Sequence, residues 1–267
     1  MSRLSDRLQA LAESDRKALV TFITAGDPTL DATVPALHSL VAGGADVLEL
    51  GVPFSDPEAE GPVIQASSER GLSQGTTLPK VLEMVRDFRA TDPDTPVVLM
   101  GYLNSVLAMG IEKFADAAGA AGVDGLIMVN LPPEEAHEIK PLLDARGIDL
   151  VFLVAPTTTA ERAAYIVNNA SGFIYYVSLK GITGADHLQV ESVAENVQSL
   201  KAITRIPVLV GFGIKDAAAA RAVARYADGV VIGSALVTTM AEAAACPETI
   251  PERLTAQIGE IRAALDT

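Results

Sequence analysis

One pattern recurs along this chain: a short apolar run, a turn rich in Gly, Pro or Asp, and then an alanine-rich amphipathic stretch. The runs are apolar at nearly every position, which is typical of parallel strands buried on both faces. The stretches between them repeat their apolar residues at helical spacing. The predicted strands are 18–24, 46–50, 96–100, 125–129, 149–154, 173–177, 207–211 and 229–232. The predicted helices between them are 30–42, 78–90, 111–121, 133–146, 159–169, 190–203 and 216–226.

Eight strand–helix units in a chain of 267 residues predict an α/β fold, the (β/α)8 TIM barrel. Further helices are expected at 4–12, ahead of the first strand, and at 250–265. The alternative is a doubly wound open sheet, but Thr-Ala-Gly-Asp-Pro at 24–28 stands where that fold carries its glycine fingerprint. Because no linker or change of composition interrupts the chain, residues 1–267 are predicted to form a single barrel domain.

Composition excludes several classes of protein. The chain has 20 Lys and Arg against 34 Asp and Glu, a net charge of −14, which argues against non-specific binding to nucleic acid or to an anionic membrane. Hydrophobic residues at 49% exclude a disordered chain. Cys246 is the single cysteine, so no internal disulfide is expected. No signal peptide or membrane span is recognisable, so a cytoplasmic protein is expected.

Carboxylates occur near the end of the second predicted strand and in the loop after it, at the end of a barrel where catalytic residues are found. Glu49 stands in an otherwise apolar run, and a carboxyl group directed into a barrel mouth would lose water and gain a higher pKa. A solvated strand end or a core ion pair explains its position equally well. The loop at 51–62 carries Asp56, Glu58 and Glu60. It is interpreted either as the source of a second catalytic acid or base or as a solvated lid.

Glycines end the seventh and eighth predicted strands, at Gly211, Gly213 and Gly233. Their backbone amides, with a short helix starting beyond Ser234, predict a phosphate site that needs no Lys or Arg. The glycines around Thr183 indicate a lid hinge or an anion cradle. Four aromatic residues at strand ends predict an apolar slot for a flat ring, with ordinary core-capping residues as the alternative. They are Phe22, Tyr102, Tyr175 and Phe212.

Seven runs in order along the whole chain resemble the tryptophan synthase alpha subunit family. The most specific of them is Glu-Leu-Gly-Val-Pro-Phe-Ser-Asp-Pro at 49–57. The others are Phe-Ile-Thr-Ala-Gly-Asp-Pro at 22–28, Gly-Pro-Val-Ile-Gln at 61–65, Gly-Phe-Ile-Tyr-Tyr-Val-Ser at 172–178, Gly-Ile-Thr-Gly-Ala at 181–185, Gly-Phe-Gly-Ile at 211–214 and Gly-Ser-Ala at 233–235.

The resemblance implies a lyase of tryptophan biosynthesis that cleaves indole-3-glycerol phosphate to indole and glyceraldehyde 3-phosphate by a retro-aldol reaction. It implies that Glu49 shuttles protons at indole C3 and the glycerol hydroxyl, and that the carboxylate of residue 60 handles the indole N–H. The implied substrate-binding residues are Phe22, Tyr102, Tyr175 and Phe212 around the indole, Gly184, Gly213, Gly233 and Ser234 around the phosphate, and Thr183, which would engage residue 60.

The same resemblance implies a partner. The family works with a beta subunit, as an alpha2-beta2 heterotetramer, and pyridoxal phosphate belongs to the beta subunit alone. No metal and no cofactor are therefore expected in this chain. The implied partner surface is the loop at 53–60 together with Asn104 and Pro132.

This chain departs from the family pattern at a few positions. Glu60 stands where the family usually has Asp, Asn130 replaces another usual Asp, Ser105 replaces a Pro, and Leu179-Lys180 replaces a common Arg-Ala. A displacement of about 1 Å can cost about 100-fold in rate. These departures leave open a divergent paralogue, either a weak partner-independent lyase or a non-catalytic regulator of the beta subunit. A sugar-phosphate isomerase or epimerase would share the glycines but has no use for the aromatic slot.

Overall fold

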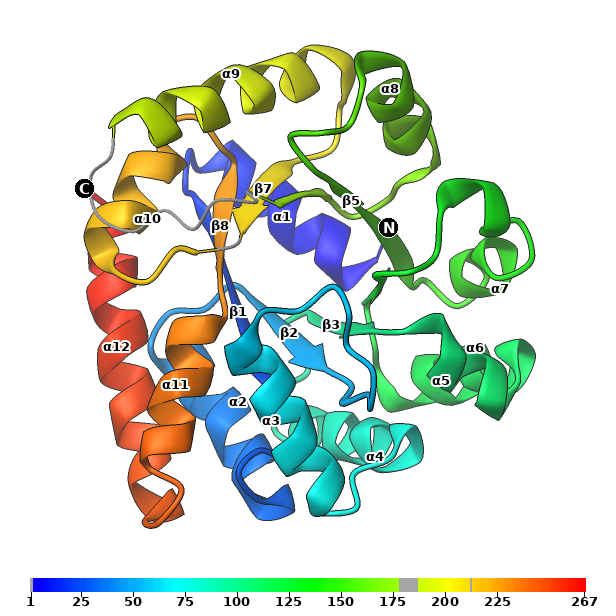
Figure 1. The fold of residues 1–267 in the computed structure, drawn as a ribbon, viewed down its shortest axis with the longest axis vertical. Helices are drawn as coiled ribbons and strands as arrows, with labels where there is room; N and C mark the ends of the chain where they lie inside the picture. The colour runs from blue at the N-terminus through cyan, green and yellow to red at the C-terminus, as the bar shows by residue number, and fades with distance from the viewer. Residues whose placement is uncertain (1, 178–186, 212) are drawn as a thin grey trace.

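The fold was determined as a computed structural model, which describes residues 2–177, 187–211 and 213–267. Eight parallel strands pair in chain order, and β1 closes the barrel against β8. Figure 1 shows the strands at the centre of a ring of helices. The strands are β1 Ala18–Thr24, β2 Val47–Gly51, β3 Val97–Gly101, β4 Gly125–Met128, β5 Asp149–Val154, β6 Ile174–Val177, β7 Val208–Gly211 and β8 Gly229–Ile232. The predicted TIM barrel is confirmed, with every strand boundary within one residue of its prediction.

The helices cover the outside of the barrel. They are α1 Arg3–Glu13, α2 Thr33–Ala42, α3 Pro62–Ser73, α4 Leu78–Arg89, α5 Leu103–Met109, α6 Ile111–Ala121, α7 Lys140–Asp144, α8 Ala160–Asn169, α9 His187–Ile203, α10 Ala217–Ala224, α11 Ser234–Glu242 and α12 Ile250–Leu265. Helices α8 and α10 begin at side-chain caps: the side chains of Thr159 and Asp216 accept hydrogen bonds from the N–H groups of Arg162 and Ala219. Single turns of 3-10 helix lie at Leu30–Ala32, Pro133–Glu135 and Pro247–Thr249.

Two helices, α3 and α5, have no counterpart in the sequence prediction. The buried face of α3 is formed by Ile64, Ser67, Ser68 and Gly71, so its apolar periodicity is weak. Helix α5 has seven residues, of which Val106 alone is buried. The helix predicted at 133–146 is also wrong in extent, because it is divided into a 3-10 turn and the short α7. Pro141 has no N–H to bond within a longer helix and is tolerated in the first turn of α7.

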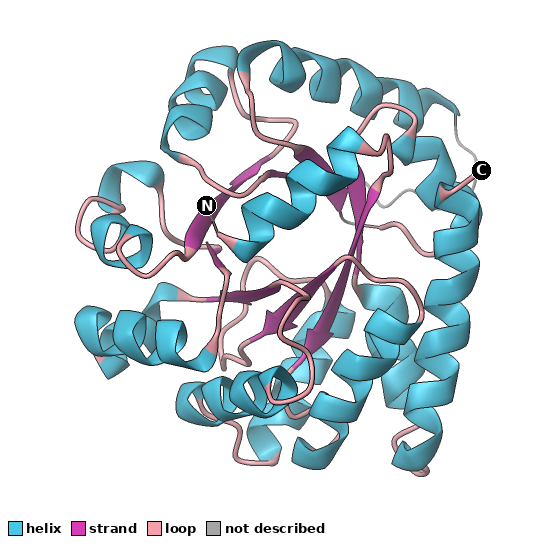
Figure 2. Ribbon diagram, turned by 180° about the vertical axis from the view of Figure 1, so that it is seen from behind, coloured by secondary structure: helices cyan, strands magenta, loops and turns pink. Residues whose placement is uncertain are grey.

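Helix α1 closes the bottom of the barrel, the end at which the strands begin. Figure 2 shows it crossing the barrel from behind. Its buried residues Leu4, Leu8 and Leu11 pack in one cluster with inward-facing strand residues such as Val47 and Val98. Because α1 fills this end, access to the interior is left to the opposite end, where the strands finish.

At this bottom end, four residues join neighbouring strands in pairs through hydrogen bonds. Asp46, Asp124 and Asp228 each directly precede an even-numbered strand, and Ser171 lies three residues before β6. Each donates its N–H to a carbonyl on the preceding odd-numbered strand and accepts the N–H of that same residue on its side-chain oxygen. The partners are Leu19 for Asp46, Val97 for Asp124, Leu150 for Ser171 and Val208 for Asp228. We call these four residues the barrel clamps.

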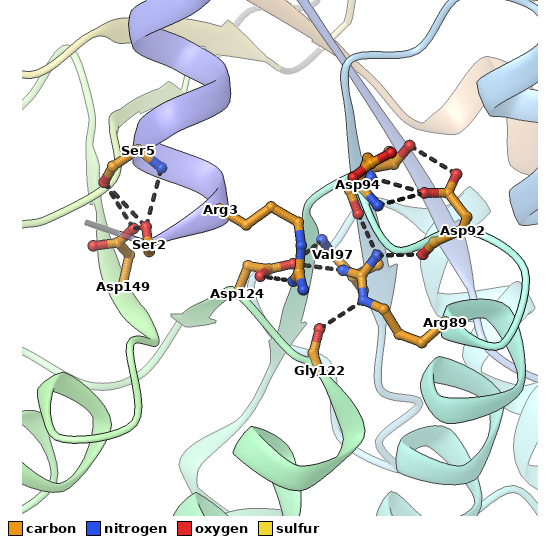
Figure 3. A network of polar contacts seen from close by, with 11 residues as sticks. Ser2, Arg3, Ser5, Arg89, Asp92, Asp94, Val97, Gly122, Asp124 and Asp149 are labelled. Atoms are coloured by element: carbon orange, nitrogen blue, oxygen red, sulfur yellow. Dashed lines mark hydrogen bonds and ion pairs between the residues drawn. The ribbon is translucent and has the colours of Figure 1, made fainter.

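Arginines surround the buried clamps. Asp124 pairs with Arg89 at 2.6 Å and also with Arg3 of α1, as Figure 3 shows. Asp46 pairs with Arg7 of α1 at 2.8 Å and with Arg262 of α12 at 3.1 Å. A buried carboxylate is stable only when it is paired and hydrogen-bonded, and these contacts also fix α1 under the barrel.

Candidate active site

Strand β2 carries Glu49 into the upper layer of the barrel interior. Its neighbours Leu48 and Leu50 pack outward in the helix-facing core, and Val47 packs inward in the layer below. Glu49 stands in register with Phe22 of β1 and Val98 of β3. The strand therefore aims a single carboxyl group into an apolar interior, as the alternation of a β-strand requires.

Glu49 has lost nearly all contact with solvent. It is 1% exposed, and neither carboxyl oxygen has a hydrogen-bond partner among the described residues. Burial, reinforced by repulsion from Glu60, raises the pKa of Glu49 to about 8. At neutral pH the side chain is therefore mostly a neutral acid, able to donate a proton.

The loop after β2 brings a second carboxyl group to the same place. Its residue Glu60 is half-buried, and burial raises its pKa to about 7. The loop is held from β3: the hydroxyl of Tyr102 accepts a hydrogen bond from the N–H of Ala59 at 2.9 Å, and its ring stacks on Phe54. Gln65 of α3 donates to the carbonyl oxygen of Glu60 at 3.0 Å. The backbone on both sides of Glu60 is thus anchored.

Both carboxyl groups line one cavity of about 60 Å³ at the upper end of the barrel. It brings together seven of the predicted site residues: Phe22, Glu49, Glu60, Tyr175, Gly213, Gly233 and Ser234. A Cβ atom on Gly211 would lie 2.4 Å from the hydroxyl oxygen of Tyr175. Glycine is therefore needed at 211 for that ring to lie across β7. Burial and the two nearby carboxylates raise the pKa of Tyr175, so its hydroxyl stays protonated.

One edge of the cavity is made of backbone. Gly213 has a φ of +83°, a conformation that favours glycine. Gly233 is the N-cap of α11, whose first intrahelical bonds run from Leu236 and Val237 to the Gly233 carbonyl. The N–H groups of the preceding first-turn residues have no acceptor within the helix, which makes this edge suited to an anion.

The remaining predicted residues are placed differently. Tyr102 does not line the cavity with Glu49 but an adjoining one of about 20 Å³, which it shares with Phe22 and Glu60. Thr183, Gly184 and Phe212 lie outside the described residues. The sequence analysis missed Ile64, Met100, Ile214 and Val231, which complete the apolar wall. Met100 was recognisable as the inward-facing end of a strand, but Ile64 depends on the unpredicted helix α3.

Comparison with known proteins agrees with this geometry. A family model described as tryptophan synthase alpha chain matches residues 8–266. The tryptophan synthase alpha chain of Laribacter hongkongensis is 57% identical over 266 residues, covering 100% of both chains. That of Marinobacter nauticus is 54% identical, covering 100% of this chain and 99% of the relative.

The chain belongs to the tryptophan synthase alpha chain family. The crystal structure of tryptophan synthase subunit alpha from Legionella pneumophila superposes with a TM-score of 0.93 at 44% identity, covering 100% of this chain and 99% of that one. A structure of Mycobacterium tuberculosis tryptophan synthase superposes with a TM-score of 0.90 at 37% identity, with coverage of 100% and 99%. The resemblance found in the sequence is confirmed.

Asn130 lies in the loop after β4. Its side-chain oxygen accepts the N–H of Leu103 at 2.8 Å, and its amide donates to Asn104 at 3.1 Å. The amide thus joins the start of α5 to the loop after β4. A carboxylate at this position could accept from Leu103 but could not donate to Asn104.

The described residues contain no group of three or more His, Cys, Asp or Glu side chains placed to hold a metal ion. Within the same part of the chain, no helix is both long enough and apolar enough to cross a membrane.

Proposed function

We propose that Glu49 and Glu60 carry out the reaction of the tryptophan synthase alpha chain, the cleavage of indole-3-glycerol phosphate to indole and glyceraldehyde 3-phosphate. Family membership makes the chain a carbon–carbon lyase of tryptophan biosynthesis. The observation that supports the residue assignment is the pair of carboxyl groups in one cavity, with pKa values raised to about 8 and about 7. Two carboxyls with different pKa values are suited to separate acid and base roles.

In the proposed mechanism Glu49 acts first as the acid. Its protonated carboxyl group transfers a proton to C3 of the indole ring, which loses its aromaticity and leaves positive charge on the ring nitrogen. The ionised carboxylate of Glu60 accepts a hydrogen bond from the indole N–H and offsets that charge. Ionised Glu49 then removes the proton of the adjacent glycerol hydroxyl.

Cleavage of the carbon–carbon bond completes the reaction. The electron pair of the broken bond returns to the ring and restores indole, while the hydroxyl carbon becomes the aldehyde of glyceraldehyde 3-phosphate. Glu49 ends the cycle protonated, as it began, so no net proton is consumed. Because one residue serves as acid and then as base, its raised pKa near neutrality suits both steps.

The remaining predicted site residues are assigned to binding. Phe22, Tyr102, Tyr175 and Phe212 are proposed to enclose the indole ring, and Gly184, Gly213, Gly233 and Ser234 to hold the phosphate, with Thr183 engaging Glu60. The described residues around the cavity include no Lys or Arg, so the backbone amides and the N-terminus of α11 would bind the phosphate.

We also infer the setting in which the chain works. It is proposed to act as one barrel domain in the cytoplasm, in an alpha2-beta2 heterotetramer with a tryptophan synthase beta subunit. The surface for that partner is proposed at the loop 53–60, Asn104 and Pro132. Pyridoxal phosphate is assigned to the beta subunit, and the chemistry proposed for Glu49 and Glu60 needs no cofactor in this chain.

The direct test follows indole release from indole-3-glycerol phosphate, with and without a beta subunit. We expect Glu49→Gln to lower kcat by about 100-fold or more, because Gln cannot transfer the proton. Glu60→Gln should lower it as well, since the amide cannot offset positive charge. Absence of indole release by the unmodified chain in both conditions would refute the lyase assignment.

The variant Glu60→Asp tests whether the carboxylate of Glu60 is placed for catalysis. If Glu60 reaches the indole nitrogen, shortening it moves the carboxylate away, and kcat falls by about 10-fold or more. Glu58→Asp is the matched control on the same loop, since Glu58 is exposed. A large rise in kcat for Glu60→Asp, with unchanged binding of the beta subunit, would instead support the regulatory paralogue.

A further inference from the structure

A second and larger cavity lies at the opposite end of the barrel from Glu49 and Glu60. Its volume is about 320 Å³, and it lies between the end of α1, the segment joining α9 to β7, and Asp228. Ala18 and Pro207 in its wall stand at the beginnings of β1 and β7. Figure 2 views this end of the barrel, with α1 across it. We call it the floor cavity.

The floor cavity is positively charged in a strongly acidic protein. Four of its thirteen lining residues are Lys or Arg, against 20 in the 267 residues of the chain. They are Arg16, Lys17, Lys201 and Arg205. Asp15 and Asp228 supply two negative charges, so the lining carries 4 − 2 = +2 where the whole chain carries −14. Such a concentration of one sign of charge in a concave wall attracts an anion.

Several of these cations retain capacity to bind a ligand. Arg16 makes only long ion pairs, with Asp46 at 3.3 Å and with Asp266 at 3.5 Å, and both carboxylates also pair with Arg262. Lys17 donates to the carbonyl of Ala227 at 3.1 Å, a neutral partner. Lys201 is paired with Asp228 at 2.5 Å. Arg205 is exposed and makes no ion pair with any residue that the structure describes.

Apart from Thr204, the uncharged part of the wall is apolar. Leu8 and Leu11 belong to its buried part, and Ala12, Ile206 and Pro207 are its accessible surface beside the cations. A bare inorganic ion would leave this surface in water, whereas an apolar body would cover it. The volume of about 320 Å³ also falls at the lower end of the range of small-molecule sites, about 300 to 1,000 Å³.

We propose that the floor cavity is a second ligand site, for a small organic anion that carries one acidic group on an apolar body. The acidic group, a phosphate, sulfonate or carboxylate, would lie against Arg205, Arg16 and Lys17. The apolar body would lie against the accessible apolar residues Ala12, Ile206 and Pro207. This site is separate from the lyase site, since the barrel strands lie between them.

The test uses 8-anilinonaphthalene-1-sulfonate, an amphiphilic anion whose fluorescence rises in an apolar site. The full chain is titrated with saturating indole-3-propanol phosphate present, so that the lyase site is occupied. We expect one probe molecule per chain, with binding weakened at least 10-fold by Arg205→Glu, because a charge-assisted contact becomes a repulsion. Ala12→Phe fills the cavity from the exposed side of α1 and should abolish binding.

Matched controls separate the floor cavity from general charge effects. Arg253→Glu changes the charge of the chain equally at an exposed site outside the cavity, and should leave probe affinity within twofold. Sulfate alone and the neutral N-phenyl-1-naphthylamine should each bind at least 10-fold more weakly than the probe. Indole release by Arg205→Glu should be unchanged.

Amide NMR shifts locate the bound probe. Shifts at 15–18 and 204–206 support the proposal, whereas shifts confined to Gly213, Gly233 and Ser234 overturn it. Equal affinity of Arg205→Glu and Arg253→Glu also overturns it, as does equal binding of the neutral analogue.

Discussion

Glu49 and Glu60 show how two identical side chains acquire different acidities from their surroundings. Glu49 is carried by a strand into the barrel, where it has no hydrogen-bond partner among the described residues, and its pKa rises to about 8. Glu60 lies on a loop that retains some solvent contact, and its pKa rises to about 7. The difference in burial, not in chemical type, separates the proposed acid from the proposed base.

These acidities predict a bell-shaped pH profile for kcat/KM. Below about pH 7 Glu60 is protonated and no longer offsets charge at the indole nitrogen. Above about pH 8 Glu49 is ionised and has no proton to donate to C3. Activity should therefore be highest between these values and fall on both sides. Because the groups repel each other, the two limbs describe the pair rather than each residue alone.

Glu60→Gln tests the coupling between the two groups. It removes the acidic limb together with the negative charge that helps to raise the pKa of Glu49. The basic limb of the residual activity should therefore move to lower pH. Glu58→Gln, on the exposed part of the same loop, should leave both limbs in place. A basic limb that does not move in Glu60→Gln would contradict the coupling.

At the scale of the elements, helix α3 and the loop before it complete the site. Arg70 of α3 pairs with the buried Asp27 after β1, at 2.6 and 2.9 Å, and Ser67 bonds Thr24 of β1 at 2.6 Å. The helix is thus fixed by polar contacts and supports the loop that carries Glu60. The cavity of about 60 Å³ is smaller than most ligand sites, about 300 Å³ or more.

Tyr102 is predicted to position this loop. Tyr102→Phe keeps the ring beside Phe54 but removes the hydrogen bond from Ala59, a loss of about 1 kcal/mol. We expect kcat for indole release to fall about fivefold. The acidic limb of the pH profile should move to lower pH, because a looser loop exposes Glu60 to water. Tyr165→Phe, on the exposed surface of α8, is the control, and an unmoved acidic limb in Tyr102→Phe would contradict the positioning role.

At the scale of the whole molecule, the barrel clamps join the strands in four pairs. Asp46, Asp124, Ser171 and Asp228 make the same two hydrogen bonds between an even strand and the odd strand before it. Three also hold a cation, and Ser171 does not. The same pair of hydrogen bonds therefore recurs around the bottom of the barrel, the end opposite the candidate active site. This separation is typical of barrels, in which residues at the bottom serve stability.

Comparing two clamp residues separates the contribution of the ion pair to stability from that of the hydrogen bond to the backbone. Asp124→Ala leaves the Val97 N–H without its acceptor and removes the carboxylate paired with the largely buried Arg89, which keeps only carbonyl acceptors. It should lower the free energy of unfolding by about 3–5 kcal/mol. Ser171→Ala removes the equivalent backbone contact alone, and should cost about 1–2 kcal/mol. Urea unfolding of both variants gives the comparison. Equal losses would show that the arginines around Asp124 contribute nothing.

The order of elements was predictable because it depends on local pattern. Strands buried on both faces are apolar throughout, and caps such as Asp216 mark where helices begin. Helix α3 escaped prediction because its buried face consists mainly of Ser67, Ser68 and Gly71. Among the site residues, Glu49 was identifiable as the one acid in an apolar run, whereas Ile64 gave no signal because its role depends on where α3 packs.

The sequence by itself determined the eight-unit barrel, the family and the candidate acid on the second strand, because apolar periodicity and motif spacing are local properties. Only the tertiary structure decided that Glu60 lies beside Glu49, that both lose water, and that Tyr102 holds the loop instead of lining the same cavity. It alone revealed the clamps and the floor cavity, whose lining residues Leu8 and Asp228 lie 228 − 8 = 220 positions apart in the chain. Desolvation and electrostatic coupling depend on which distant residues pack together, and no run of sequence contains that information.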